Sequence, residues 1–258
     1  NGEGFLYPAI NEQKCVDCGL CYKKCPAGEY DFDTPEIPDC YAVWAEKSIR
    51  EQSSSGGMFT VLAEHILEKK GVVVGAAWDK DLHVEHIIID RKEDLYKLRG
   101  SKYVQSIIDG TLFRRIKTLL ENGTNVLFSG CPCQVAGLKK FLGKDYDNLV
   151  TIDIVCHGVP SPAVLDSYVS EVAEGRKVKH IDFRDKKYFG WSTITVFKFN
   201  DNSEYVKSYF ESPWYIGFLQ GIIIRENCGQ CKYAKTQRVG DITLGDFWQI
   251  QKIDPKCN

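Results

Sequence analysis

The sequence lacks the features that would place it in a membrane or on a nucleic acid. No apolar run among its 258 residues approaches the roughly 20 residues that span a bilayer. Its formal net charge of -2 gives no general attraction to nucleic acids or to anionic lipid surfaces. We therefore expect no membrane span and no nucleic-acid partner.

Two further absences concern nucleotide motifs and export signals. The chain contains no GxGxxG and no P-loop, so a Rossmann dinucleotide site is not indicated. Its first residues, NGEGFLYPAINEQ, have neither a basic start nor a long apolar stretch, and so they do not resemble a secretory signal.

Cysteine, by contrast, is abundant, with 11 residues. Disulfide-rich folds are mostly small secreted domains, and this chain is longer than those and shows no secretion signal. Clustered CxxC spacings favour metal or redox roles in a reducing compartment. We therefore expect a cytoplasmic protein whose cysteines serve metal or redox chemistry.

The chain changes character near residue 50. Residues 1–35 are short of periodic runs and are punctuated by Gly, Pro and Cys. Residues 36–50 resemble a linker, with prolines near its start. From residue 51 onward helical and strand patterns alternate. We therefore expect an N-terminal segment over 1–35, a linker over 36–50 and one domain over 51–258.

Hydrophobic periodicity predicts the elements of that domain. Helical spacing predicts helices at 58–70, 111–122, 134–142 and 161–173. Apolar and β-branched runs predict strands at 72–78, 84–89, 125–129 and 150–155, and a hairpin over 192–209. Such alternation is typical of βαβ units. The predicted fold class is an α/β core around a mostly parallel or mixed sheet.

Residues 14–26, KCVDCGLCYKKCP, form one half of the two-cluster bacterial ferredoxin pattern. In that pattern the first three cysteines hold one [4Fe–4S] cluster, and the cysteine before proline ligates the other. The matching residues are Cys15, Cys18, Cys21 and Cys25. Gly19 suits a tight loop that needs an unusual φ. A zinc knuckle is the alternative, which three evenly spaced cysteines followed by Cys-Pro disfavour.

A second group of cysteines is scattered along the domain. Its members are Cys131 and Cys133 in SGCPCQVAGL, Cys156 in VCHGVPSP, and Cys228 and Cys231 in NCGQCKY. Cys133 and Cys156 each follow a predicted strand, and loops after parallel strands gather at one sheet edge, where cofactors usually bind. The CGQC pair would complete a four-cysteine site there. Spacing alone leaves open an iron–sulfur cluster, a zinc site and buried structural thiols.

Two glycine-containing turns are candidates for phosphate binding. SSSGG at 53–57 precedes the first predicted helix, whose free N–H groups would suit a phosphate. RGSKY at 99–103 is a basic turn that could clamp a pyrophosphate. Each turn also has a plainer interpretation, as a serine N-cap and as a solvated turn.

An ordered set of motifs after the ferredoxin pattern gives the chain a family resemblance. In chain order these are SSSGGMFT, LRGSKYVQS, GCPCQVAGL, CHGVPSP, CGQC and DITLGDFW. Over nearly its whole length the chain resembles the coenzyme F420 hydrogenase/dehydrogenase beta subunit family. The resemblance implies an iron–sulfur flavoprotein that binds FAD in a non-Rossmann α/β core. It also implies electron transfer between a [4Fe–4S] cluster and the flavin, which exchanges hydride with a soluble substrate, F420 in the methanogen enzymes.

The resemblance also implies roles for residues at matching positions. The core cluster would be held by Cys133, Cys156, Cys228 and Cys231. Cys131 departs from the family, since relatives usually have Thr or Ser there. The flavin would lie between two loops, formed by Ser54, Ser55, Gly56 and Gly57 on one side and by Gly100, Ser101, Lys102 and Tyr103 on the other, with Lys102 near its phosphates. Asp241 and Asp246 match a family segment near that site, without an assigned role.

Relatives usually carry a second ferredoxin half before a stretch like NGEGFLYPAINEQKC and continue beyond DFW. We therefore expect a partial ferredoxin segment and a domain that is incomplete at its C-terminus. The missing half would supply the fourth ligand for the cluster of Cys15, Cys18 and Cys21. Cys40 is a poorer source of that ligand because of the prolines that precede it, Pro35 and Pro38.

The sequence thus predicts an oxidoreductase subunit that passes electrons between [4Fe–4S] clusters and FAD, for hydride exchange with F420 or an unidentified acceptor. Expected partners are an electron-donor protein or a hydrogenase/dehydrogenase-type subunit, and a small-molecule hydride acceptor. The alternatives are an electron-relay subunit with clusters but no flavin, and a zinc-stabilised binding module. His157, beside Cys156, is a candidate catalytic proton donor, against a structural role next to the cluster.

Overall fold

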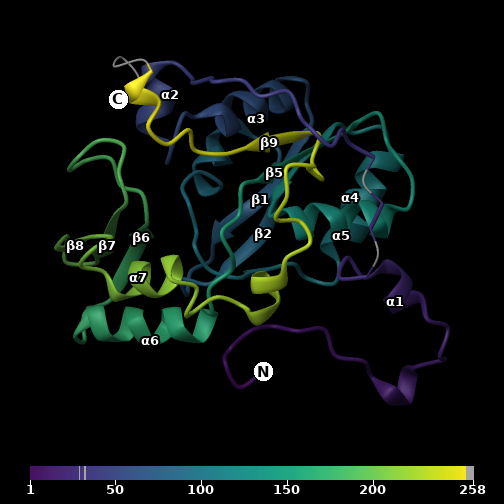
Figure 1. The fold of residues 1–258 in the computed structure, drawn as a ribbon, viewed down its shortest axis with the longest axis horizontal. Helices are drawn as coiled ribbons and strands as arrows, with labels where there is room; N and C mark the ends of the chain where they lie inside the picture. The colour runs from purple at the N-terminus through teal and green to yellow at the C-terminus, as the bar shows by residue number, and fades with distance from the viewer. Residues whose placement is uncertain (29, 32, 254–258) are drawn as a thin grey trace.

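A six-stranded mixed sheet is the main feature of the structure, a computed structural model that describes residues 1–28, 30–31 and 33–253 (Figure 1). The strands lie in the order β3-β2-β1-β4-β5-β9. β1 pairs with β2 in antiparallel fashion, and the other neighbouring pairs are parallel. The strands are β1 (Val72–Trp78), β2 (Val84–Ile89), β3 (Ser106–Ile107), β4 (Val126–Gly130), β5 (Leu149–Ile154) and β9 (Ile242–Leu244).

Helices cover both faces of this sheet because successive side chains of a strand point to opposite sides. On one face Val72 and Val74 of β1 pack with α4 and α5. On the other face Val73 and Ala77 pack with α3 and with the 3-10 helix η2. These helices are α3 (Met58–Glu68), η2 (Lys92–Lys97), α4 (Leu112–Glu121) and α5 (Pro132–Leu142). The predicted α/β core with a mixed sheet is confirmed.

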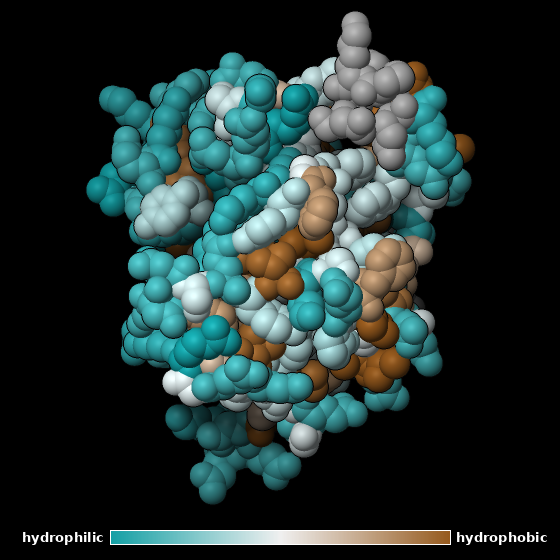
Figure 2. Space-filling model, turned by 90° about the vertical axis from the view of Figure 1, so that its left-hand side faces the viewer, coloured by the Kyte–Doolittle hydropathy of each residue, from teal (hydrophilic) through white to brown (hydrophobic). Residues whose placement is uncertain are grey.

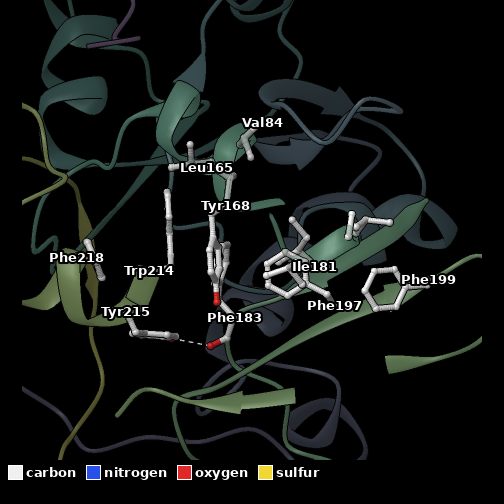
Figure 3. Close-up of a cluster of buried hydrophobic side chains, with 14 residues drawn as sticks. Val84, Leu165, Tyr168, Ile181, Phe183, Phe197, Phe199, Trp214, Tyr215 and Phe218 are labelled. Atoms are coloured by element: carbon white, nitrogen blue, oxygen red, sulfur yellow. Dashed lines mark hydrogen bonds between the residues drawn. The ribbon is translucent and has the colours of Figure 1, made fainter. Parts of the chain in front are cut away.

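A second, antiparallel sheet of three strands has its own aromatic core. It contains β6 (Val178–Asp182), β7 (Ile194–Phe199) and β8 (Glu204–Ser208), and it packs with α6 (Pro162–Ala173) and α7 (Pro213–Leu219). The β7–β8 pair is the predicted hairpin. Figure 3 shows this core, in which Tyr215 Oη donates to the carbonyl of Phe183 at 2.6 Å. The side of the molecule drawn in Figure 2 is mostly hydrophilic, with hydrophobic side chains exposed toward its middle.

Short helices punctuate the remaining segments. They are η1 (Glu12–Lys14), α1 (Leu20–Lys24), α2 (Lys47–Glu51), η3 (Glu226–Gln230) and η4 (Ile250–Lys252). Within the described ranges, none of the helices has the length and apolar character needed to cross a bilayer.

A buried histidine in β2 makes the stability of the fold sensitive to acid. His86 is 5% exposed, stacks on Phe128 with ring centres 5.5 Å apart, and shares a hydrogen bond of 3.1 Å between Nε2 and the carbonyl of Ser129. Burial lowers the pKa of His86 from 6.5 to about 4. The unfolded chain therefore binds more protons than the folded chain between these values, so stability falls as pH drops below 6.5.

We expect this histidine to remove about 2 kcal/mol of unfolding free energy between pH 6.5 and 5. The His86→Gln variant keeps a donor for Ser129 O but does not titrate, so its stability should vary less over this interval. The exposed His65 supplies the matched control, His65→Gln. Urea unfolding at several pH values measures the slopes. Equal slopes in wild type and His86→Gln would contradict the assignment.

Candidate functional site

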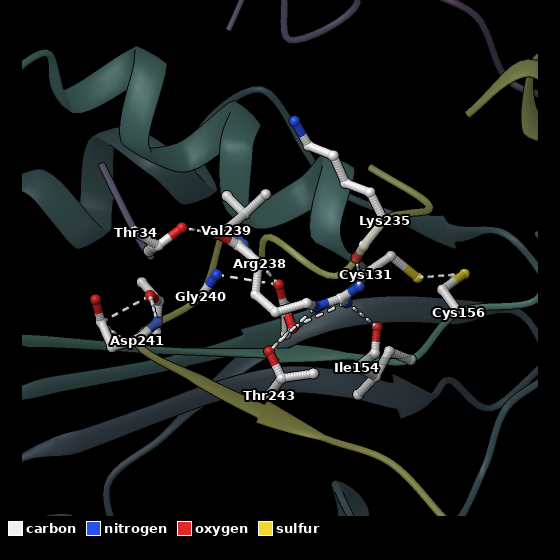
Figure 4. Close-up of polar contacts among 12 residues, drawn as sticks. Thr34, Cys131, Ile154, Cys156, Lys235, Arg238, Val239, Gly240, Asp241 and Thr243 are labelled. Atoms are coloured by element: carbon white, nitrogen blue, oxygen red, sulfur yellow. Dashed lines mark hydrogen bonds and ion pairs between the residues drawn. The ribbon is translucent and has the colours of Figure 1, made fainter. Parts of the chain in front are cut away.

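Two neighbouring parallel strands end at core cysteines. β4 ends at Gly130 and β5 ends at Ile154, and the two strands pair in parallel. Cys131 caps the N-terminus of α5, and Pro132 follows with the fixed φ that suits a first turn. Cys156 follows β5, and its Sγ lies 3.8 Å from the Sγ of Cys131 (Figure 4). The sheet edge thus joins two cysteines that are far apart in the sequence.

The CGQC segment reaches the same edge. A β-bridge joins Pro160 to Ile224 and brings the chain after α7 alongside the loop that follows Cys156. Cys228 then lies in η3, and Cys231 directly follows that helix. Burial raises the pKa of Cys228, and the thiols of Cys156 and Cys231 lie close enough to raise it further.

Cys133 joins this group from the first turn of α5. Burial, followed by the thiols of Cys156, Cys231 and Cys228, raises the pKa of Cys133 to about 12. Cys133 still keeps an exposed side, whereas Cys131 is half-buried. The four predicted ligands are therefore neighbours, and Cys131 is a fifth cysteine that contacts Cys156.

This set of donors suits an iron–sulfur cluster. Thiolates are soft ligands, which select iron–sulfur clusters, zinc or copper(I). Among the described residues, no three His, Cys, Asp or Glu side chains lie close enough together to hold a single metal ion. A cluster separates its ligand thiolates more widely than one zinc ion does, because four irons lie between them. The gathered thiols fit a cluster in their chemistry, and their role as its ligands stays a prediction.

A buried ion pair fixes the chain beside Cys156 (Figure 4). Asp153, at the end of β5, is 0% exposed. Its carboxylate accepts hydrogen bonds from Arg238 Nη2 at 3.2 Å, Val239 N at 3.1 Å, Gly240 N at 3.0 Å and Thr243 Oγ1 at 2.6 Å. Arg238 Nη2 also donates to the carbonyl of Ile154 at 3.1 Å. The network ties the segment between CGQC and β9 to the strand that leads into Cys156.

The two aspartates of DITLGDFW have separate structural partners. Asp241 Oδ2 accepts from the backbone N and the Oγ1 of Thr151, both at 2.7 Å, and so joins β9 to β5. Asp246 Oδ2 accepts from Nη1 of the buried Arg184 at 2.8 Å. Asp241 therefore stabilises the six-stranded sheet. Asp246 is held by Arg184, which follows β6 of the three-stranded sheet.

The ferredoxin-type segment exposes most of its cysteines. Cys15, Cys18 and Cys21 are exposed, and Cys25 is half-buried. Gly19 has a φ of 66° at the N-terminus of α1, as expected for the loop. Cys40 is exposed, and its Sγ lies 3.6 Å from the carbonyl of Pro38.

The last cysteine of this segment is docked on α5. Lys140 Nζ donates to the carbonyl of Cys25 at 3.1 Å, and Tyr233 Oη donates to the carbonyl of Pro26 at 2.6 Å. Tyr233, two residues after Cys231, is 4% exposed. Burial raises its pKa, with smaller contributions from the core thiols and from Cys25. A buried tyrosine thus lies close to both cysteine groups.

The two predicted flavin-binding turns are joined and border two cavities. Ser101 N donates to Ser54 Oγ at 2.8 Å. A cavity of ≈ 410 Å³ lies against Ser54, and one of ≈ 260 Å³ lies against Ser101. Gln52, Gly100 and Asp182 line both. Because they share these residues, the two cavities adjoin. Their combined volume lies in the range of small-molecule sites, about 300–1,000 Å³.

Other residues predicted to bind flavin make contacts within the two turns or with the neighbouring backbone. Lys102 Nζ donates to the carbonyls of Arg99 at 2.7 Å and Gly100 at 3.2 Å, and burial lowers the pKa of Lys102 to about 7. Ala45 N donates to Gly56 O at 2.7 Å. A Cβ on Gly57, where φ is +85°, would lie 3.0 Å from the Cβ of Ala45. Contact between these residues and a flavin remains a prediction.

The larger cavity also has basic walls that the sequence analysis missed. Arg184, Lys186 and Lys187 line it, and all three come from the connection between β6 and β7. Lys186 Nζ donates to the carbonyls of Arg50 and Ser55, both at 2.8 Å, which docks this connection on the SSSGG turn. In the sequence, the charged run RDKK at 184–187, directly after Phe183, is the feature that could have indicated these basic walls.

An aromatic contact path leads from Cys156 toward the cavities. His157 Nε2 lies 3.1 Å from the carbonyl of Phe218, and the two rings meet edge to face with centres 4.9 Å apart. Phe218 stacks on Tyr103 with ring centres 4.9 Å apart. Tyr103 Oη in turn accepts from Arg184 Nη1 at 3.3 Å. His157 is thus held against Phe218, and its proposed proton-donor role remains untested.

Comparison with known proteins gives matches along most of the chain. Residues 123–256 match the C-terminal part, and residues 40–112 the N-terminal part, of the coenzyme F420 hydrogenase/dehydrogenase beta subunit. Residues 7–30 match a 4Fe-4S binding domain.

The proteins similar to this chain include a sulfite reductase and a chain of a hydrogenase complex. It is 26% identical over 188 residues to a coenzyme F420-dependent sulfite reductase of Methanocaldococcus jannaschii, a match that covers 60% of this chain and 29% of that protein. The chain thus spans less than a third of that relative. Its fold resembles a chain of the F420-reducing [NiFe] hydrogenase complex from Methanosarcina barkeri, with a TM-score of 0.56, 17% identity, and coverage of 84% of this chain and 74% of that one.

Proposed function

Because this chain belongs to the coenzyme F420 hydrogenase/dehydrogenase beta subunit family, we propose that it is an iron–sulfur flavoprotein oxidoreductase subunit. In this proposal [4Fe–4S] clusters exchange electrons with FAD, which exchanges hydride with a soluble acceptor. The iron–sulfur part is supported by the 4Fe-4S binding motif at residues 7–30. The similar proteins, named as a reductase and a hydrogenase, support a redox role.

The observation that supports the proposal most is that side-chain contacts link the core cysteines to the ferredoxin-type segment on one side and to the cavities on the other. On one side, Tyr233 lies close to both Cys25 and the core thiols. On the other, His157, Phe218 and Tyr103 lead from Cys156 toward the cavities beside Ser54 and Ser101. A continuous path of protein contacts suits electron transfer from the N-terminal segment through the core to a cofactor.

Each part of the chain would have a defined task in this activity. Cys15, Cys18, Cys21 and Cys25 would serve the N-terminal clusters, and Cys133, Cys156, Cys228 and Cys231 would hold the core cluster. When bound, FAD converts one-electron transfers into a two-electron hydride step. Ser54 and Ser101 would orient it, and the stacked Phe218 and Tyr103 would exclude water between cluster and flavin.

The acceptor and the partner form the finer part of the proposal. F420 is one candidate acceptor, because both similar proteins carry it in their names. The partner would be an electron-donor protein or a hydrogenase/dehydrogenase-type subunit that supplies electrons to the exposed cysteines 15–21. We assign this activity to the cytoplasm, where a reducing environment keeps the thiolates available.

We expect protein purified without oxygen to contain iron, acid-labile sulfide and FAD together. The measurements are metal analysis, sulfide assay and chromatography of the flavin released on denaturation, followed by a screen of hydride acceptors that includes F420. Iron and sulfide without flavin would favour an electron-relay subunit over the proposed enzyme. Zinc without iron would favour a binding module and contradict the proposal entirely.

A further inference from the structure

The connection between β6 and β7 contains buried hydrogen-bond donors without an acceptor. Within the described ranges, Arg184 Nη2, Trp191 Nε1 and Ser192 Oγ are buried and have no partner. They lie together, because Arg184 Nε donates to the carbonyl of Ser192 at 2.8 Å, and Trp248 contacts both Arg184 and Trp191. A guanidinium can only donate, and Arg184 lines the larger cavity, so a ligand there with acceptor oxygens would satisfy its unpaired Nη2.

Positive charge at this place exceeds the negative charge that faces it. The Arg184 side chain is 3% exposed, and one carboxylate, that of Asp246, pairs with it at 2.8 Å. The ammonium of Lys186 is held by the carbonyls of Arg50 and Ser55, which carry no net charge. Two cations therefore share one anion at the wall of the larger cavity.

The other carboxylates of that cavity are occupied elsewhere. Asp182 accepts from the backbone N of Arg184 at 2.9 Å, and its charge faces the buried ammonium of Lys102. Asp185 accepts from the backbone N of Lys187 at 2.7 Å and pairs with Lys198 at 3.7 Å. Glu51 pairs with Lys47 at 3.7 Å. An anion would be the natural partner for the remaining charge, since buried cations need hydrogen-bonded counter-charges.

The shape of the surroundings narrows the class of anion. The smaller adjoining cavity is lined by Trp78, Tyr96 and Ile181, which suit a flat ring. A dinucleotide has ring systems on both sides of a pyrophosphate. We propose that Arg184, with the charge of Lys186 beside it, binds the pyrophosphate of a flavin dinucleotide. This rests on the proposed function and assigns the direct contact to Arg184, whose Nη2 has no acceptor, in place of Lys102, whose ammonium donates to two carbonyls of its own turn.

The test uses flavins that differ in phosphate content. Holoprotein is stripped of flavin with its clusters kept, and the affinities for riboflavin, FMN and FAD are measured by flavin fluorescence. Arg184→Gln combined with Asp246→Asn removes the cation without leaving a buried carboxylate unpaired. We expect a fall of about 10- to 100-fold in FAD affinity, which corresponds to one charge-assisted contact, and little change for riboflavin. Inorganic pyrophosphate should compete with FAD in the wild type and not in the variant.

Lys187→Gln is the matched control, because Lys187 lines the same cavity but pairs with Glu204 at 2.9 Å, and its FAD affinity should stay near wild type. Equal losses for riboflavin and FAD, or unchanged FAD affinity, would overturn the site while leaving the proposed function standing. If the wild type binds no flavin, the proposed function fails. In that case Arg184-dependent binding of pyrophosphate alone supports the anion site, and its absence overturns it.

Discussion

Cys156→Ser is expected to lose the core iron–sulfur cluster, with iron content falling by about four atoms per chain. A serine oxygen is a hard donor that gives up its proton reluctantly and replaces a thiolate poorly. Cys156 lies at the centre of the group, since its thiol influences Cys131, Cys133 and Cys228. Iron and sulfide analysis, with the EPR signal of the reduced protein, measures the loss. Cys40→Ser, at an exposed position outside the group, is the control and should keep its iron.

The same experiment decides between the two cysteines of the CPC sequence. Pro132 fixes the backbone between them, so both thiols are not expected to bind the same iron. The family position points to Cys133, and Cys131→Ser should therefore keep the cluster. Cluster loss in Cys131→Ser with retention in Cys133→Ser would reverse the ligand assignment. Zinc in wild-type protein prepared without oxygen would refute the cluster itself.

Periodicity predicts the elements that have long, regular patterns. The strands at 72–78 and 84–89 and the helix starting at Met58 match the structure closely, because β1 and β2 are apolar runs in the sheet and the helix buries one apolar face. The sequence could also have predicted that β1 and β2 are antiparallel. Residues 79–83 between them are too few for the crossover that a parallel pair needs.

Elements without such a pattern were missed. β9 has three half-buried residues, too few to establish an alternation. β6, with the sequence VKHID, has Lys179 and His180 at adjacent exposed positions, which breaks the alternation of a strand. α7, PWYIGFL, is apolar on its exposed side as well as on the side that packs on the small sheet, and so its sequence lacks helical periodicity. Each was set by tertiary packing rather than by local sequence.

The candidate site likewise has one part that the sequence predicted and one part that it did not. The sheet-edge argument predicted that Cys133 and Cys156 would lie together, since parallel strands bring their following loops to one edge. Nothing local connects Arg184 to Asp246, because their pairing depends on how the small sheet packs against the C-terminal segment. The sequence therefore indicated the thiols and missed the cations.

Asp153→Ala is expected to lower the unfolding free energy by about 3–5 kcal/mol, the cost of leaving one partner of a buried ion pair alone. Asp153 is fully buried and accepts from Arg238, two backbone N–H groups and Thr243. Alanine would strand a guanidinium that is 13% exposed, together with three further donors. Thermal and urea unfolding of protein prepared without oxygen measure the change.

The matched control is Asp166→Ala, since Asp166 is 55% exposed and its carboxylate lies 3.9 Å from the Nε2 of His83. A surface change of this kind should stay within about 0.5 kcal/mol of wild type. The double variant Asp153→Ala/Arg238→Leu removes both charges and should recover part of the loss, because no buried charge is left unpaired. Arg238 also donates to Ile154 O, two residues before Cys156, so the single variant should hold the core cluster less firmly as well. If Asp153→Ala were as stable as Asp166→Ala, the network would not be what fixes the chain beside Cys156.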